Sequence, residues 1–211
     1  MTASPSPEVV VGVTGSIAAY KAADLVRRLR ECGCAVTCVL TREAERFLAP
    51  LTLQALSGRR VQTDLFGLDD PHVLHTELAD HAKLILIAPA TANIIGKLAH
   101  GLADDVLTCL TLATKAPVLL APAMNVHMWQ HATVRTNMAR LKALGYHVVG
   151  PTHGPLVCGY EAIGHLAEVD DVVQASLKLL KRFSGLSMPA AAPPRPTARR
   201  ASRSASRARK R

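Results

Sequence analysis

Residues 122–129 combine side chains that suit a small-molecule site. They read Pro-Ala-Met-Asn-Val-His-Met-Trp and follow directly on a strand-like apolar run. Met124, Met128 and Trp129 offer apolar faces to a flat or thioether-sized group, while the amide of Asn125 can donate to a carboxylate and accept from an amide. The same side chains could instead pack the start of a helix against the core. Other segments must decide between these two interpretations.

A small-residue turn near the N-terminus is the second candidate segment. Residues 12–21 read Gly-Val-Thr-Gly-Ser-Ile-Ala-Ala-Tyr-Lys and lead into a helix. Exposed backbone N–H groups and the hydroxyls of Thr14 and Ser16 favour a phosphate. The turn is neither the G-x-G-x-x-G fingerprint nor a P-loop, which disfavours a dinucleotide or an ATP-driven machine. A tight strand-to-helix connection explains the small residues equally well.

Two further loops have related compositions. Thr41 and Arg42 could add a hydroxyl and a charge to the same phosphate, or Thr41 could cap a helix. In residues 89–93, Pro-Ala-Thr-Ala-Asn, small side chains let a planar ring approach the backbone, and Asn93 could bond a heteroatom edge. A capped helix start is again the alternative. Together the loops favour a phosphorylated flat cofactor, and flavin mononucleotide (FMN) matches that shape.

The elements that must position these loops alternate along the chain. Short aliphatic runs alternate with longer amphipathic segments, which predicts a single α/β domain with a doubly wound parallel sheet and helices on both faces. Ligands in such sheets bind outside the carboxyl ends of the strands, where all four segments fall. The predicted strands are Val9–Val13, Ala35–Leu40, Leu84–Ala88, Val118–Ala121 and His147–Val149, with a weaker one near Arg60–Gln62. The predicted helices are Ile17–Cys32, Leu51–Leu56, Thr91–Ala99, Asp105–Ala113, Val134–Leu144 and Val169–Arg182.

Charge is concentrated at the C-terminus. The chain has 211 residues and a formal charge of +9, but residues 189–211 hold eight of its 25 lysines and arginines and no acid. This segment lacks apolar periodicity, so we expect a short extension at 1–7, a folded domain at 8–188 and a disordered basic tail. Binding of nucleic acid is disfavoured and, if present, confined to the tail, because no aromatic residue is available there to stack on bases.

Cysteine usage and the N-terminus indicate the compartment. The number of cysteines is odd and they form no C-x-x-C pair, so neither a disulfide framework nor a metal site is predicted. Residues 1–8 lack a signal-peptide pattern, and no apolar run approaches the roughly 18 residues that span a bilayer. We expect a soluble cytoplasmic protein with no membrane association. The cysteines are Cys32, Cys34, Cys38, Cys109 and Cys158.

The motifs as a set resemble a known family. They are Gly-Ser-Ile-Ala-Ala-Tyr-Lys at 15–21, His75, the segments 89–93 and 122–129, and Leu-Val-Cys-Gly-Tyr-Glu-Ala-Ile-Gly at 156–164. In this order and spacing they resemble the homo-oligomeric flavin-containing cysteine decarboxylases of flavodoxin-like (Rossmann-like) fold, most of all the branch that acts on phosphopantothenoylcysteine. The resemblance runs from about Val9 to Val173.

The resemblance implies a redox-neutral decarboxylation. FMN takes a hydride from the thiol-bearing carbon of 4'-phosphopantothenoylcysteine, the resulting thioaldehyde loses carbon dioxide to give an ene-thiol, and the hydride returns to give 4'-phosphopantetheine for coenzyme A biosynthesis. The family also implies a homotrimer, or a dodecamer built of trimers, with FMN at the subunit boundary. By resemblance the cofactor-binding residues are Gly15, Ser16, Ile17, Thr41, Pro89, Thr91 and Asn93.

Three residues take catalytic roles by the same resemblance. His75, placed before a helical segment and with His72 as its rival, would act as a base or electrostatic partner near the thiol and carboxylate. Asn125 would bind the carboxylate and amide of the substrate. Cys158 would donate a proton to the ene-thiol, since a thiol of ordinary pKa is mostly protonated at neutral pH. The predicted substrate-binding residues are Asn125, Met128, Trp129 and Cys158.

The chain departs from the family pattern in the cysteine loop. Where A-C-G-x-x-G-x-G is expected, Val157 precedes the cysteine, Tyr160 follows Cys158-Gly159, and Ala162 replaces a common glycine. Gly154, Gly159 and Gly164 predict a mobile loop that closes over substrate. The expected domain also ends near residue 188 without a synthetase half, so we expect a stand-alone decarboxylase with the ligase on another polypeptide.

Three alternatives remain at this point. A peptidyl-cysteine decarboxylase acting on a ribosomal peptide would share His75 and Asn125 but use a different clamp loop. A flavin prenyltransferase has a similar fold but would not require the histidine, residues 122–129 and the cysteine together. A flavin-binding regulatory protein could act on a partner through the basic tail, although the three catalytic residues speak against it.

Overall fold

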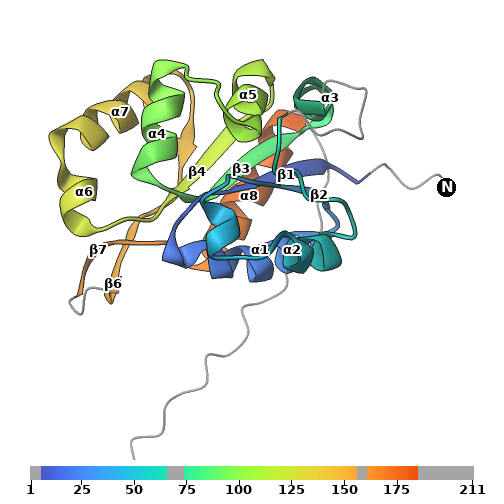
Figure 1. The fold of residues 1–211 in the computed structure, drawn as a ribbon, viewed down its shortest axis with the longest axis horizontal. Helices are drawn as coiled ribbons and strands as arrows, with labels where there is room; N and C mark the ends of the chain where they lie inside the picture. The colour runs from blue at the N-terminus through green and yellow to red at the C-terminus, as the bar shows by residue number, and fades with distance from the viewer. Residues whose placement is uncertain (1–5, 66–73, 156–160, 185–211) are drawn as a thin grey trace, which may run out of the picture.

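The structure is a computed structural model that describes residues 6–65, 74–155 and 161–184. The predictions for Cys158, for the loop around it, for His72 and for the basic tail lie outside these residues. The described part forms one α/β domain around a central sheet (Figure 1). None of its helices combines the length and the apolar character that a bilayer crossing requires.

The central sheet has five parallel strands in the order β2-β1-β3-β4-β5. All seven residues of β3 are buried, as expected of a central strand covered on both faces. The order reverses direction between β1 and β3, which makes their carboxyl ends the topological switch point of the sheet. The strands are β1 (Glu8–Val13), β2 (Ala35–Leu40), β3 (Leu84–Ala90), β4 (Val118–Pro122) and β5 (His147–Val148).

Helices cover both faces of the sheet, so the predicted doubly wound architecture is confirmed (Figure 1). Alternate strand residues feed two separate cores: Val9 and Val11 face one layer, whereas Val10 faces the other. The first layer consists of α1 (Lys21–Glu31), α2 (Pro50–Ser57) and α8 (Val169–Ser184). The second consists of α3 (Leu74–His81), α4 (Ala92–His100), α5 (Val106–Ala113) and α7 (Ala132–Ala143).

Two predicted elements differ from the structure. Residues 60–62 form only an isolated bridge, in which Gln62 pairs with Val39 at the sheet edge. The single helix expected from Ile17 is divided into a 3-10 turn, η1 (Ile17–Tyr20), and α1. Ser16 is the N-cap of this 3-10 turn, and its hydroxyl accepts from the Ala18 N–H at 3.3 Å. A second 3-10 turn, η2 (Ala44–Arg46), follows β2.

An antiparallel hairpin replaces the expected loop between β5 and α8. Its strands are β6 (Thr152–Pro155) and β7 (Glu161–His165), so Gly154 and Gly164 belong to strands rather than to a glycine-rich loop. The hairpin lies beside α6 (Val126–Gln130) at one end of the domain (Figure 1). One hydrogen bond, from the Met124 N–H to the Gly164 carbonyl at 3.0 Å, joins it to the segment that leads into α6.

Gly164 is required at this junction. Its φ of +138° is a conformation that side chains rarely adopt, and a Cβ atom there would overlap the Met124 carbonyl oxygen. We expect Gly164→Ala to lower the free energy of unfolding by about 2 to 4 kcal/mol in urea titrations. The matched control is Gly154→Ala in the partner strand, where a Cβ would lie 3.4 Å from the His165 ring, an ordinary contact. Equal stability of the two variants would contradict this account.

Candidate functional site

A cavity of about 300 Å³ opens at the carboxyl edge of β1, β3 and β4, where the sheet order reverses. It collects residues from five separate segments of the chain, including the four segments after strands that the sequence singled out. Its size falls at the lower end of the range for cofactor and ligand sites. The lining residues are Thr14, Gly15, Ser16, Thr41, Glu43, Thr91, Ala92, Asn93, Ile94, Asp105, Ala123, Met124 and Met128.

The turn after β1 supplies one wall of the cavity. Gly15 packs so closely on the loop after β2 that an added Cβ would lie 2.5 Å from the Glu43 Cβ, so no side chain fits there. Ser16 is partly exposed in the cavity. Ile17 is 57% exposed and is not among the residues that line the cavity.

Thr14 has a different role from the one that the sequence suggested. Its hydroxyl is almost fully buried and donates to the Pro89 carbonyl at 2.6 Å, while it accepts from the Thr91 N–H at 3.2 Å. The proton is therefore committed to the protein, and Thr14 ties the ends of β1 and β3 together. Pro89 contributes its carbonyl to this tie and does not line the cavity.

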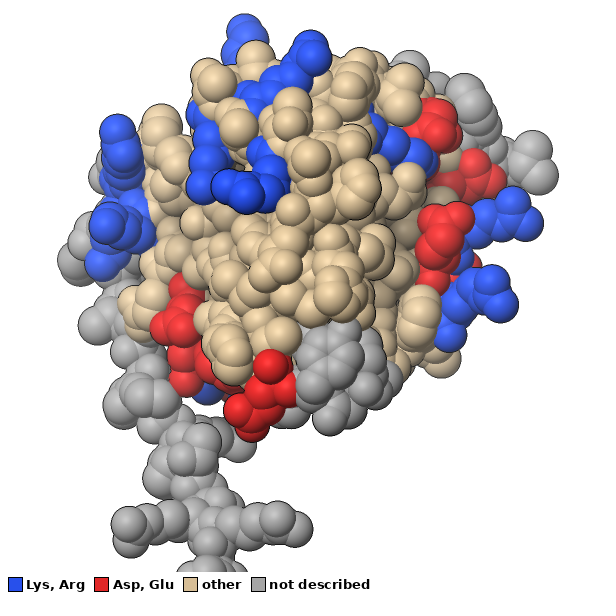
Figure 2. Space-filling model, turned by 90° about the vertical axis from the view of Figure 1, so that its left-hand side faces the viewer, with Lys and Arg blue, Asp and Glu red and all other residues tan. Residues whose placement is uncertain are grey.

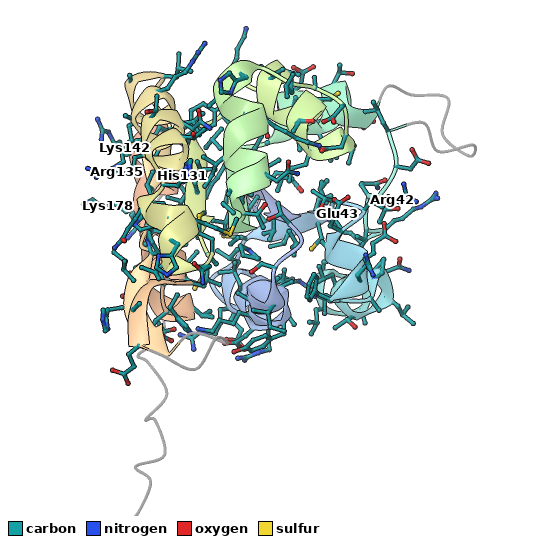
Figure 3. The ribbon with its side chains drawn as sticks, turned by 60° about the vertical axis from the view of Figure 1, so that its left-hand side comes forward. Arg42, Glu43, His131, Arg135, Lys142 and Lys178 are labelled. Carbon is teal, nitrogen blue, oxygen red and sulfur yellow. The ribbon has the colours of Figure 1, made fainter. Side chains whose placement is uncertain are left out.

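The loop after β2 brings a hydroxyl and a carboxylate to the cavity. Thr41 is buried and lines the cavity, and its hydroxyl accepts from the Ala44 N–H at 3.3 Å, although the N-cap of η2 is Glu43. Glu43, which the sequence analysis missed, lines the same wall. Arg42 is exposed and directed outward beside it, away from the cavity (Figure 3).

The segment after β3 caps a helix at the cavity and lines it at the same time. Thr91 is the N-cap of α4, and its hydroxyl accepts from the Ile94 N–H at 3.4 Å. Asn93 is exposed in the first turn of α4 and lines the cavity. Thr91 and Asn93 therefore form the start of a helix and also line the cavity, so the two alternatives for this segment are compatible.

Residues 122–129 divide between two sides of α6. Asn125 is the N-cap of this helix, and its Oδ1 accepts from the His127 N–H at 2.8 Å, which fixes the orientation of the amide. Met124 and Met128 line the cavity. Trp129 does not: it packs against the core under α4 and α7 and lines a separate groove.

The charged groups at the cavity are acidic. Asp105 caps α5 by accepting from the Thr108 N–H at 2.9 Å, and Lys97 binds Asp104 at 2.7 Å and Asp105 at 2.9 Å. Burial by itself would lower the pKa of Lys97, but the hydrogen bonds to both carboxylates raise it. The hydrogen bond from Lys97 lowers the pKa of Asp104. No lysine or arginine of the described residues lines the cavity.

Of the other two predicted catalytic residues, His75 and Cys158, only His75 lies within the described residues. His75 is the second residue of α3, whereas the sequence placed it before the helix, and Cys158 lies outside the described residues. The other cysteines are poor candidates for a reactive thiol. Burial raises the pKa of Cys34 and of Cys38 to about 12, and burial also raises the pKa of Cys109.

Glu43 and Asp105 are the chemically notable residues that sequence reasoning did not find. Glu43 lies two residues after Thr41, so extending the search past the end of β2 would have found it. Asp105 lies between two helices and not after a strand, so the rule of strand ends could not find it. Within the described residues, no group of three or more His, Cys, Asp or Glu side chains is placed to hold a metal ion.

This sheet order and a cavity at its switch point define a flavodoxin-like α/β protein with a ligand site between β1 and β3. The chain belongs to the flavoprotein family, whose model matches residues 2–181.

Two relatives show which proteins of this family the chain is similar to. The chain is 48% identical over 171 residues to the coenzyme A biosynthesis bifunctional protein CoaBC of Bacillus subtilis, covering 81% of this chain and 42% of that protein. It is 42% identical over 170 residues to a probable phosphopantothenoylcysteine decarboxylase of Streptococcus mutans, covering 79% of this chain and 95% of that protein. The chain therefore spans less than half the length of the bifunctional relative.

A solved structure shares the fold. A Cys-to-Ser mutant of PPC decarboxylase, complexed with pantothenoylaminoethenethiol, matches with a TM-score of 0.73 and 31% sequence identity. The match covers 84% of this chain and 99% of that chain. Relatives and structure agree on the family that the sequence motifs indicated.

Proposed function

We propose that this protein is an FMN-dependent phosphopantothenoylcysteine decarboxylase, which converts 4'-phosphopantothenoylcysteine to 4'-phosphopantetheine in coenzyme A biosynthesis. The observation that carries the proposal is the cavity at the β1/β3 switch point, because it brings predicted cofactor residues from three loops next to the Asn125 segment. The relatives that bear this name cover most of the chain.

The described residues fit an FMN group. Hydroxyls of Ser16 and Thr41 lie on one wall and suit a phosphate, while Asn93 and the two methionines suit the polar edge and the faces of a planar ring. The turn at Gly15 lacks the third glycine of a dinucleotide fingerprint, which favours a mononucleotide. Bound there, FMN would supply an acceptor and later a donor of hydride, which decarboxylation of a cysteine requires.

Asn125 would orient the carboxylate that is lost. Because its Oδ1 is held by the His127 N–H, the Nδ2 donors are the part of the amide that would meet a carboxylate. An amide does this without the charge repulsion that an aspartate would introduce at the same place. His75 would take up the thiol proton, and Cys158 would return a proton to the carbon of the ene-thiol.

We propose further that the active site needs a second copy of the chain. Helix α3, which carries His75, lies at the opposite end of the domain from α6, which begins after Asn125 (Figure 1). One chain therefore does not bring these helices together, whereas a homotrimer can. Exposed apolar side chains of the segments that follow β1 and β2 suit such a contact. They are Ile17, Tyr20, Phe47 and Leu51, which are 57%, 62%, 48% and 72% exposed.

The remaining assignments follow from the same proposal. The decarboxylase domain would span residues 8–188, with the basic tail as an accessory that activity does not need. The reaction belongs to the cytoplasm, in keeping with free thiols at the four described cysteines.

The first test is direct. The purified protein should be yellow, release one equivalent of FMN on denaturation and release carbon dioxide from 4'-phosphopantothenoylcysteine. Asn125→Ala should keep the flavin but lose kcat by roughly 100-fold or more, because the carboxylate loses its positioning donors. Asn93→Ala serves as the counterpart, since it should weaken flavin binding instead. A colourless protein that cannot be reconstituted with FMN would end the proposal.

The second test concerns Cys158, the proposed proton donor. Cys158→Ala should still release carbon dioxide but should yield the oxidised ene-thiol in place of 4'-phosphopantetheine, because no proton is delivered to the carbon. Mass spectrometry separates the two products by two hydrogens. Cys109→Ala is the matched control and should give the normal product. Normal product from Cys158→Ala would assign the proton to another group.

Mixed oligomers test the shared site. His75→Asn and Asn125→Ala should each be inactive alone, whereas trimers containing both, isolated through two different affinity tags, should regain about a third of the wild-type activity, since one of the three interfaces in such a trimer carries both intact residues. Mixtures that stay inactive while their oligomeric state is unchanged would show that His75 and Asn125 act within one chain.

A further inference from the structure

Helix α6 separates two hollows. Met128 lines the cavity at the sheet edge, and the next residue, Trp129, lines a second groove of about 430 Å³. The two hollows therefore lie one residue apart along the same short helix. The groove is lined by Trp129, Gln130, Arg135, Met138, Ala139, Lys142 and Ile163.

The groove has an apolar floor and a basic wall. Trp129, Met138 and Ile163 provide the apolar contacts, and no acidic residue is among the lining. Arg135 and Lys142 are seven residues apart on α7, which places both on one face of the helix. Figure 3 shows them along one side of the molecule with His131 and, from α8, Lys178.

These two cations have no ion-pair partner within the described residues, although both are exposed. Some other cations are paired: Arg27 binds Asp24 and Glu31, and Arg59 binds Glu8. Lysines and arginines also gather in the upper part of this face, with few acids near them (Figure 2). The positive charge of the groove is therefore not neutralised locally.

Such a lining selects a particular kind of ligand. The planar fork of Arg135 matches the oxygens of a phosphate, and an ammonium group such as that of Lys142 adds a second charge-assisted contact. The apolar floor suits an aliphatic chain or gem-dimethyl group attached to that phosphate. A ligand that combines both features has complementary charge and shape.

We infer that the groove binds the phosphate end of the substrate, with Arg135 and Lys142 as its anchors, while the cysteine end reaches the cavity past Met128. The choice of ligand rests on the proposed function, in which the substrate carries a phosphate at one end and the reacting cysteine at the other. Arg135 and Lys142 are binding and specificity residues, remote from the reacting atoms.

Binding to the flavin-loaded protein tests the inference directly. Isothermal titration calorimetry should show that the wild type binds 4'-phosphopantetheine about tenfold or more tightly than pantetheine. The double variant Arg135→Gln/Lys142→Gln should bind both about equally, with the affinity for pantetheine unchanged. The charge-matched control Arg140→Gln/Lys115→Gln, from exposed positions outside the groove, should keep the wild-type preference.

Three results would overturn the inference: equal binding of both ligands by the wild type, an unchanged preference in the groove variant, or the same loss of preference in the control. A smaller oligomer of the groove variant in size-exclusion chromatography would also overturn it, because the groove would then be a contact between copies of the chain.

Measurements of turnover distinguish a failure of this inference from a failure of the proposed function. The groove variant should still release carbon dioxide from pantothenoylcysteine, which lacks the phosphate, at the wild-type rate.

Discussion

The hydroxyl of Thr14 joins the two strand ends between which the sheet reverses direction. It donates to the Pro89 carbonyl at 2.6 Å and accepts from the Thr91 N–H at 3.2 Å, in a position almost closed to solvent. Because a buried hydroxyl that loses one partner leaves the other unsatisfied, this pair of bonds holds the ends of β1 and β3 in one arrangement. The loops that form the cavity walls start from these strand ends, so the distance between the walls depends on the two hydrogen bonds of Thr14.

Much of the fold was predictable because parallel strands buried on both faces need uninterrupted apolar runs. Ala35–Leu40 was predicted to the residue, and β1, β3 and β4 to within two residues of each end. The hairpin was not predictable in the same way. Its strands, such as Thr152–Pro155, contain glycine, proline and polar residues, and their pairing depends on docking beside α6 rather than on local preference.

The site was predictable as a place but not in every side chain. Gly15, Ser16, Thr41, Thr91, Asn93 and Met128 meet in one cavity because loops after parallel strands share an edge. Which way a side chain points depends on the helix that follows. Trp129 and Met128 are neighbours in the sequence, yet a turn of about 100° per residue in α6 sends them to different hollows. Asp105 lies between two helices, so only tertiary packing brings it to the cavity.

The acidic lining of the cavity affects how its occupant responds to ionic strength. With Glu43 and Asp105 present and no described lysine or arginine, a dianionic group there would be held by hydroxyl and amide dipoles. Contacts of that kind are screened little by dissolved ions, whereas attraction to exposed cations such as Arg135 and Lys142 weakens within a Debye length of about 8 Å at physiological salt. High salt would therefore release a phosphate from the groove at a lower salt concentration than is needed to release a nucleotide from the cavity.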